Sequence, residues 1–131
     1  MSKRIPILIV EDEKHIRNIL DYSLRLDGFD VYTAENGTVA LELAHKHKFK
    51  VILLDWMMPE MNGLEVLSEL KHNKKTENIP VFMLTAKGVI GDIDQAYDIG
   101  ADGYFTKPFN ARELGSAIKT KLREYEEAKS R

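Results

Sequence analysis

The sequence predicts an α/β fold, a doubly wound parallel sheet of five strands with helices on both faces. Two observations lead to this prediction. Short, almost continuous apolar runs recur along the chain, which is typical of strands buried on both faces of a parallel sheet. Between these runs the apolar residues recur with the helical period, so strand and helix alternate. Because β-α-β crossovers are right-handed, such alternation places helices on both faces of one sheet.

Five segments are predicted as strands, of which three are strongly apolar and two are weaker. The strong segments are 5–10, 51–54 and 81–84, and the weaker ones are 30–34 and 103–106. Glycines mostly mark the joints between strands and helices. We therefore expect short connections throughout the sheet.

Five helices are predicted from apolar residues that share one helical face. These faces are formed by Ile16, Ile19, Leu20 and Leu24; by Val39, Leu43 and Ala44; by Leu64, Leu67 and Leu70; by Ile93, Ala96 and Tyr97; and by Leu114, Ala117, Ile118, Leu122 and Tyr125. Asn110 and Glu113 are spaced as a capping pair and predict the start of the last helix. The lysine-rich stretches 46–50 and 71–75 are interpreted as solvated helix ends and loops.

Length and composition indicate one globular domain spanning 1–131, with a folded core from about residue 4 to residue 125. The chain has 44% hydrophobic and 31% charged residues, which argues against disorder. Its net charge of -2 argues against direct nucleic acid binding by this segment. The chain has no cysteine, no signal-peptide pattern and no run of ~20 apolar residues. We therefore expect a soluble cytoplasmic protein that does not enter the membrane.

Polar residues follow four of the predicted strands, where ligands bind in open parallel sheets. Glu11 and Asp12 follow the first strand, Asp55 the third, 85–86 the fourth and 107–108 the fifth. Each residue alone has an ordinary structural explanation, such as helix capping for the acids or a surface position for the lysine. Their joint placement at one edge of the sheet favours a functional site.

The residue types at this edge predict phosphoryl chemistry beside a divalent metal ion. Three carboxylates in one place repel each other unless a cation lies between them. Oxygen ligands without His or Cys favour Mg²⁺. The hydroxyl of Thr85 and the ammonium of Lys107 suit the oxygens of a phosphoryl group, and a carboxylate such as Asp55 can act as the nucleophile.

Four motifs occur in order along nearly the whole chain. They are ILIVEDE at 7–13, LLDWMMPEMNG at 53–63, MLTAK at 83–87 and GADGYFTKPF at 100–109. Together they resemble the receiver domain of two-component response regulators, including chemotaxis receivers. This resemblance implies the flavodoxin-like strand order 2-1-3-4-5. It also implies a phosphoryl-accepting signalling switch rather than an enzyme acting on a separate substrate.

By resemblance, Asp55 is the phosphorylated aspartate, which accepts from a phosphohistidine on a histidine kinase or histidine phosphotransfer protein. Asp12 and Asp55 would bind Mg²⁺ directly, and Glu11 would hold it mainly through water. Met57 would contribute its backbone carbonyl. Receivers vary at Met57 and at Lys87, and that variation is associated with different phosphoryl lifetimes, so the lifetime here stays open.

The resemblance also assigns the groups that would contact the phosphoryl oxygens and those that would change conformation on phosphorylation. These contacts would come from Lys107, the hydroxyl of Thr85 and the amide of Ala86. Tyr104 matches the switch aromatic, which would turn inward as Thr85 moves toward the phosphate and so change the face read by a downstream output partner or domain. The peptide bond before Pro108 is expected to be cis. Gly115 departs from the family pattern, where a larger residue is more common, and the departure bears on partner contacts at the last helix.

Two other functions fit the sequence less well. Phosphohydrolases that form an aspartyl phosphate commonly carry a second acid two residues after the nucleophile, and Met57 occupies that position. A flavodoxin-like FMN carrier would need hydroxyls and glycines after the first strand, where the acids 11–13 would repel phosphate. The sequence leaves open whether the chain acts alone, as a relay carrier or as the receiver of a longer regulator.

Overall fold

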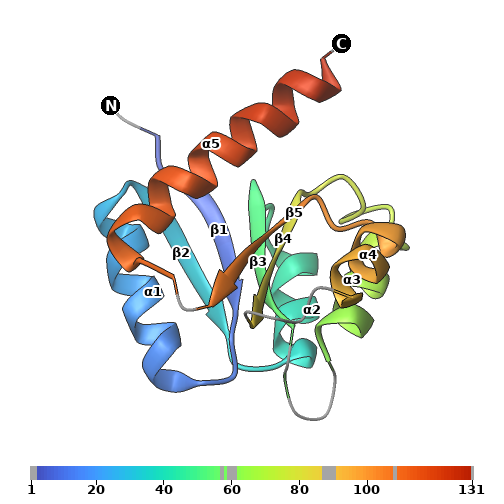
Figure 1. Ribbon diagram of the computed structural model, residues 1–131, viewed down its shortest axis with the longest axis horizontal. Helices are drawn as coiled ribbons and strands as arrows, with labels where there is room; N and C mark the ends of the chain where they lie inside the picture. The colour runs from blue at the N-terminus through green and yellow to red at the C-terminus, as the bar shows by residue number, and fades with distance from the viewer. Residues whose placement is uncertain (1–2, 57, 59–61, 87–90, 108, 131) are drawn as a thin grey trace.

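Strands and helices alternate along the whole chain in the computed structural model, which describes residues 3–56, 58, 62–86, 91–107 and 109–130 (Figure 1). The strands are β1 (Ile5–Val10), β2 (Phe29–Ala34), β3 (Val51–Asp55), β4 (Val81–Ala86) and β5 (Gly103–Lys107). The helices are α1 (Lys14–Leu26), α2 (Gly37–Lys46), α3 (Gly63–Lys71), α4 (Gly91–Ile99) and α5 (Ala111–Lys129). All five predicted strands and all five predicted helices are therefore present.

The five strands form one parallel sheet in the order β2-β1-β3-β4-β5, as the resemblance implied. The order reverses beside β1, because β2 lies on one side of it and β3 on the other. Such a reversal opens a crevice at the carboxyl ends of the central strands. A ligand site is therefore expected just beyond the carboxyl ends of β1, β3, β4 and β5.

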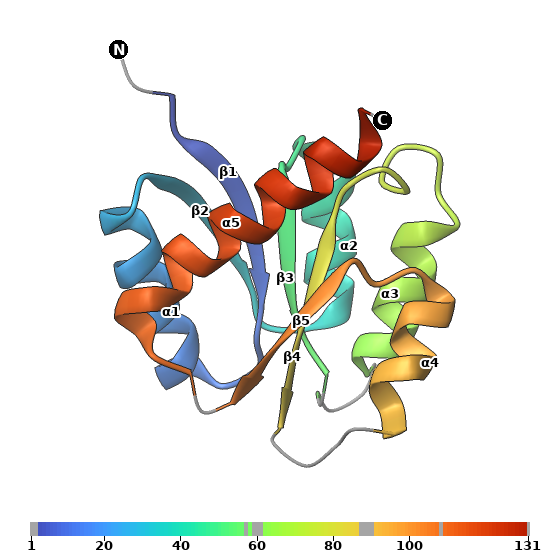
Figure 2. The same cartoon turned by 45° about the horizontal axis from the view of Figure 1, so that its top comes forward.

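Two helical layers cover the sheet, and each encloses its own apolar core. On one face, Leu20 and Leu24 of α1 and Ile118 of α5 pack with strand residues such as Ile9 and Leu53. On the other face, α2, α3 and α4 contribute apolar side chains that pack against Leu8, Val10, Ile52, Leu54, Val81 and Met83. Figure 2 shows α5 crossing one face while α2, α3 and α4 lie on the other. At about 1.5–3 kcal/mol for each buried large side chain, these two cores are the main source of stability.

Asparagine residues are the N-caps of three helices. Asn36, Asn62 and Asn110 each accept a hydrogen bond from a backbone N–H of the first turn of α2, α3 and α5. Asn110 is therefore the N-cap that the sequence predicted. Such caps satisfy N–H groups that have no partner within the helix.

Three sequence-based interpretations need correction or an explanation. Lys71 is not a solvated helix end, because its ammonium donates to the carbonyls of residues 77 and 79 and to Asp102. Tyr97 does not join Ala96 in the core but stays 44% exposed. Gly115 is buried against α1, where a Cβ would overlap the carboxylate of Asp27. A larger residue at position 115 would require the Asp27 side chain to move, so internal packing accounts for the glycine without reference to any partner. Among the described residues, no helix is long and apolar enough to cross a bilayer.

Candidate functional site

Strand register brings the predicted site residues to one edge of the sheet. Val10 pairs with Leu54, so Glu11 and Asp55 lie side by side at the ends of β1 and β3. Asp55 pairs with Leu84, which places Thr85 immediately beyond it on β4. Ala86 pairs with Lys107, so β5 delivers its lysine to the same edge. β3, β4 and β5 continue into these polar residues, because their backbone pairing extends one or two residues past each predicted strand, whereas β1 ends at Val10, just before Glu11.

The carboxylates of Glu11, Asp12 and Asp55 form one compact cluster. One oxygen from each of the three lies within 4.8 Å of the others. Glu11 and Asp55 are 1% and 3% exposed, whereas Asp12 is exposed to solvent. This donor set suits a hard dication such as Mg²⁺, because all ligands are oxygens and the exposed side leaves space for water or a phosphate oxygen.

Lys107 bridges the two buried carboxylates. Its Nζ lies 3.0 Å from Oε1 of Glu11 and 3.1 Å from Oδ1 of Asp55. Burial alone would lower the pKa of the Lys107 ammonium, but hydrogen bonding to Glu11 and the charge and hydrogen bond of Asp55 outweigh burial and raise it. Lys107 therefore stays charged and partly neutralises the pair.

One cation does not fully compensate two buried carboxylates, and the pKa of Asp55 reflects this. Burial, the hydrogen bond with Glu11 and the charge of Glu11 raise the pKa of Asp55 to about 7, against the opposing effect of Lys107. Near neutral pH Asp55 is therefore partly protonated when Lys107 is the only cation beside the pair. A divalent ion would supply the missing positive charge, so the residues present fit a metal site.

The loops that carry the site are fixed by backbone contacts. The guanidinium of Arg17 donates to the carbonyl of Glu11 at 2.8 Å and to that of Asp12 at 3.2 Å. After Asp55, the N–H of Trp56 donates to Leu84, and the carbonyl of Trp56 accepts from Gly63. A Cβ on Gly63 would lie 2.5 Å from the carbonyl oxygen of Asp55, so only glycine permits this approach of α3.

Arg17 is the supporting residue that sequence reasoning missed. It lies in the first turn of α1, directly after the acidic loop, and its backbone N–H donates to the carbonyl of Glu13. The available signal was an arginine one helical turn after three consecutive acids. Its role is to position the carbonyls of Glu11 and Asp12.

The predicted switch residues lie on the α4 side of the sheet. Thr85 is 2% exposed, and it pairs with Thr106 across the β4-β5 ladder. Tyr104 is two residues before Thr106 on β5 and shares its face. Tyr104 is 38% exposed, and its ring lies in a T-shaped contact with that of Tyr97 of α4, with 6.3 Å between ring centroids.

Some sequence-based expectations fall outside the described residues. These are the metal-binding carbonyl of Met57, the effect of Lys87 on phosphoryl lifetime and the cis peptide bond before Pro108. The strand position of Ala86 is described, and its pairing with Lys107 puts its backbone at the site.

An apolar groove of about 540 Å³ adjoins the site. Ile16 and Ile19 of α1 line one side, Phe109 and Ala111 line the other, and Lys107 contributes to the lining. Ile19 is 39% exposed, so α1 presents apolar surface next to the lysine that holds Asp55. Exposed apolar surface beside a reactive group is typical of a protein-binding face.

The chain is similar to proteins of one known family. The model of the response regulator receiver domain family matches residues 7–119. The transcriptional regulatory protein SrrA of Staphylococcus aureus (strain NCTC 8325 / PS 47) is 43% identical over 117 residues, which are 89% of this chain and 47% of SrrA. The chain therefore spans about half the length of this curated relative.

Solved structures agree with the comparison of sequences. The chemotaxis response regulator CheY4 of Vibrio cholerae superimposes with a TM-score of 0.85 at 30% identity, covering 91% of this chain and 99% of CheY4. NtrX from Brucella abortus superimposes with a TM-score of 0.87 at 27% identity, covering 97% of this chain and 28% of NtrX. The same fold thus occurs as nearly a whole chain in one protein and as a minor part of another.

Proposed function

The chain belongs to the response regulator receiver domain family, and we propose that it is a switch in which Asp55 accepts a phosphoryl group from a phosphohistidine. The observation that carries the proposal is the contact of Asp55 with Lys107 beside the carboxylates of Glu11 and Asp12. A nucleophilic carboxylate, a cation for the phosphoryl oxygens and ligands for a metal thus lie together. Membership of the family makes this chain a signalling domain.

In the proposed reaction, an ionised oxygen of Asp55 attacks phosphorus. The phosphorus–nitrogen bond of the donor breaks as the new phosphorus–oxygen bond forms, giving an acyl phosphate. Lys107 is already within 3.1 Å of Asp55 and needs only to turn its ammonium toward the phosphoryl oxygens. The Thr85 hydroxyl and the Ala86 amide are proposed to donate to the other oxygens. Such positioned donors stabilise charge that grows during the transfer.

Asp12 and Asp55 are proposed to hold Mg²⁺ directly, with Glu11 acting mainly through water and Met57 through its carbonyl. When bound, Mg²⁺ would neutralise negative charge on the carboxylates and on the phosphoryl oxygens. Arg17 keeps the acidic loop in place by its hydrogen bonds to the carbonyls of Glu11 and Asp12. The chain would catalyse only its own phosphorylation and a slow loss of the phosphoryl group.

The proposed donor is a histidine kinase or a histidine phosphotransfer protein. The apolar groove formed by Ile16, Ile19, Phe109 and Ala111 gives such a donor a surface to contact beside Lys107. The proposed readout face contains Tyr97 and Tyr104 and would act on a downstream partner or on an output domain. A cytoplasmic location and a single domain spanning 1–131 stay predictions.

Labelling with acetyl phosphate tests the assignment. Wild-type protein incubated with acetyl phosphate and Mg²⁺ should gain one phosphoryl group, and peptide mapping should place it on Asp55. Asp55→Asn should gain none. Asp94→Asn, which removes an exposed acid of α4, is the matched control and should label like wild type. Equal labelling of Asp55→Asn and wild type would exclude the proposal.

A further inference from the structure

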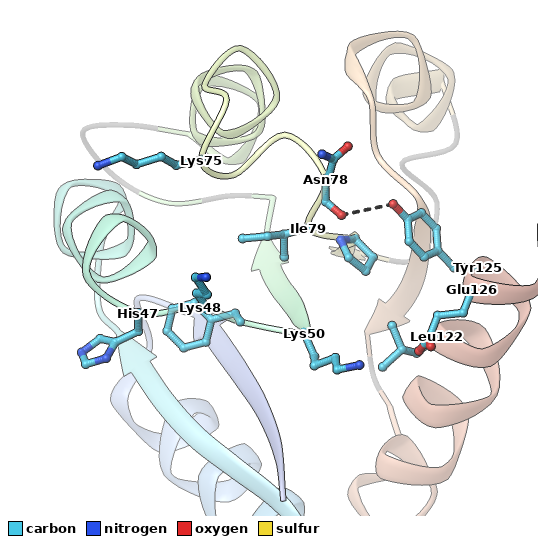
Figure 3. Close-up of a pocket in the computed structure, with 11 residues that line it drawn as sticks. His47, Lys48, Lys50, Lys75, Asn78, Ile79, Leu122, Tyr125 and Glu126 are labelled. Atoms are coloured by element: carbon cyan, nitrogen blue, oxygen red, sulfur yellow. Dashed lines mark hydrogen bonds between the residues drawn. The ribbon is translucent and has the colours of Figure 1, made fainter. Parts of the chain in front are cut away.

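The sheet edge opposite the carboxylate cluster contains a hollow of about 360 Å³ (Figure 3). It lies where β3 and β4 begin, beneath the carboxyl-terminal half of α5. Its apolar lining includes Phe49, Ile79, Pro80, Leu122 and Tyr125. Tyr125 closes one side, because its hydroxyl donates to the carbonyl of Asn78 at 3.3 Å. We call this hollow the amino-end groove.

Positive charge surrounds the amino-end groove. Lys48, Lys50 and Lys75 line it, and all three are exposed. An adjoining hollow of about 300 Å³ shares Leu122 and Glu126 with the groove and adds Lys119 and Arg123. Counting each side chain once, the two hollows carry five cations against one carboxylate, that of Glu126. This edge is therefore locally positive, although the whole chain has a net charge of -2.

We propose that the amino-end groove docks an acidic segment of a partner protein that inserts one aromatic or aliphatic side chain against Phe49 and Leu122. The lysines would attract the acids of the segment, and the apolar lining would hold its anchor residue. The two hollows adjoin along α5, which suits an extended peptide better than a compact small molecule. Glu126 favours the same choice, since its carboxylate can accept from peptide N–H groups, a contact that a nucleic acid phosphate cannot make.

Docking at this edge is compatible with either state of the site at the other edge. The groove is built on the beginnings of the strands, where the N–H of Lys50 donates to Pro6 and that of Ile52 donates to Pro80, both at 2.9 Å. These backbone bonds belong to the sheet and do not involve the carboxylate cluster. The inference therefore does not depend on the proposed phosphorylation, and affinity for the segment should be similar with and without beryllofluoride.

The test uses a fluorescein-labelled synthetic peptide of aspartate and glutamate residues with a central phenylalanine. We expect saturable binding by anisotropy, with amide shifts concentrated at 47–50, 78–79 and 122–126. The double variant Lys48→Glu/Lys50→Glu should weaken binding by about tenfold or more. Lys14→Glu, which reverses an exposed charge at the other edge of the sheet, should leave it unchanged. Replacing phenylalanine by serine in the peptide should abolish binding.

Several results would overturn the proposal. They are no saturable binding, equal weakening by Lys48→Glu/Lys50→Glu and Lys14→Glu, or tighter binding of a single-stranded oligonucleotide with the same lysine dependence. Self-association of the chain that the double variant abolishes would identify a second copy as the occupant instead. If that variant is unfolded by circular dichroism, Lys75→Glu alone is measured against the same criteria.

Discussion

At the scale of single residues, burial and charge conflict at Asp55. The folded state raises the pKa of Asp55 to about 7 from its ordinary value of 3.8. Between these two values position 55 binds more protons in the folded state than in the unfolded state, so the contribution of Asp55 to the free energy of unfolding falls as pH rises. This is the reverse of the usual effect of a salt-bridged aspartate, whose folded pKa is lowered.

The first prediction concerns stability without metal. In chelator, the free energy of unfolding of wild type relative to Asp55→Asn should fall between pH 5 and pH 8. The expected change is on the order of 2 kcal/mol, because a shift of one pKa unit corresponds to about 1.4 kcal/mol. Urea unfolding at several pH values measures it. The two proteins differ only at position 55, so the difference isolates the contribution of that side chain. A relative stability that rises with pH would contradict the reversed sign.

The second prediction separates Asp12 from its acidic neighbours. Asp12 is the exposed member of the cluster, so Asp12→Ala should weaken Mg²⁺ binding, since the ion would keep only one direct carboxylate. We expect a loss of about tenfold or more. Trp56 is the single tryptophan and follows Asp55 directly, so its fluorescence can report the titration. Glu13→Ala is the matched control, and an unchanged affinity in Asp12→Ala would remove Asp12 from the site.

At the scale of elements, Lys71 connects three segments at the end of α3. Its Nζ donates to the carbonyl of Ile79 at 2.9 Å and to Asp102 at 3.0 Å, and the same oxygen of Asp102 accepts from the N–H of Val81. The aliphatic part of Lys71 also packs against Gly100, where φ is +132°. The lysine thus holds the turn between α4 and β5 against the beginning of β4.

The third prediction is that Lys71→Met destabilises the fold by about 1–3 kcal/mol, because the carboxylate of Asp102 and a partly buried carbonyl lose a charged donor. Methionine keeps the apolar packing, so the change isolates the ammonium. Urea unfolding gives the total effect, and faster amide exchange at 100–102 should locate it. Lys74→Met, at an exposed lysine nearby, should change stability little. Equal effects of both substitutions would return Lys71 to the solvated role that the sequence suggested.

Lys71 and Lys74 also illustrate how far the sequence predicts the helices and strands. The apolar runs of β1, β3 and β4 are typical of strands buried on both faces, so the sequence predicts that these three strands exist and in which order they occur along the chain. The sequence does not predict where the strands end, because Asp55 and Lys107 are polar and are still paired within the sheet. Composition alone cannot separate Lys71 from Lys74, since only the fold brings the carbonyls of residues 77 and 79 and the carboxylate of Asp102 to Lys71.

The sequence predicts the carboxylates of the candidate site better than it predicts the contacts that hold them in place. Glu11, Asp12 and Asp55 meet because parallel strands end at one edge, and spacing reveals that much. The ion pairs of Lys107 with two buried carboxylates needed the register of β5. The amino-end groove was missed altogether, because its lining comes from loops and from α5, which are far apart in the sequence.

At the scale of the whole molecule, the site and the proposed readout face are joined through β4 and β5. Thr85 and Tyr104 lie on the same face of neighbouring strands, and Tyr104 contacts Tyr97 of α4. If Thr85 moves toward a phosphoryl group, space opens beside Tyr104 and its ring can turn inward. The contact with Tyr97 would then break, and α4 could shift while Lys71 holds the turn that follows it.

The last prediction is that Thr85→Ala switches only in part, with phosphorylation retained. Moving an equilibrium from 1:99 to 99:1 takes about 5.5 kcal/mol, whereas one hydrogen bond contributes about 0.5–1.5 kcal/mol. Lys107 and the metal must therefore supply the rest, and they remain in the variant. Amide shifts of the free and beryllofluoride-bound forms measure the populations, with BeF₃⁻ standing in for the phosphoryl group on Asp55.

In wild type, shifts should extend from the metal loops to 93–97 and to Tyr104. In Thr85→Ala they should move along the same line but stop short of the wild-type position. Thr106→Ala, which removes an exposed hydroxyl from the residue paired with Thr85 in the β4-β5 ladder, is the matched control and should behave as wild type. Wild-type shifts confined to the metal loops would exclude the route through Tyr104. Full switching in Thr85→Ala would show that the threonine hydroxyl is not part of that route.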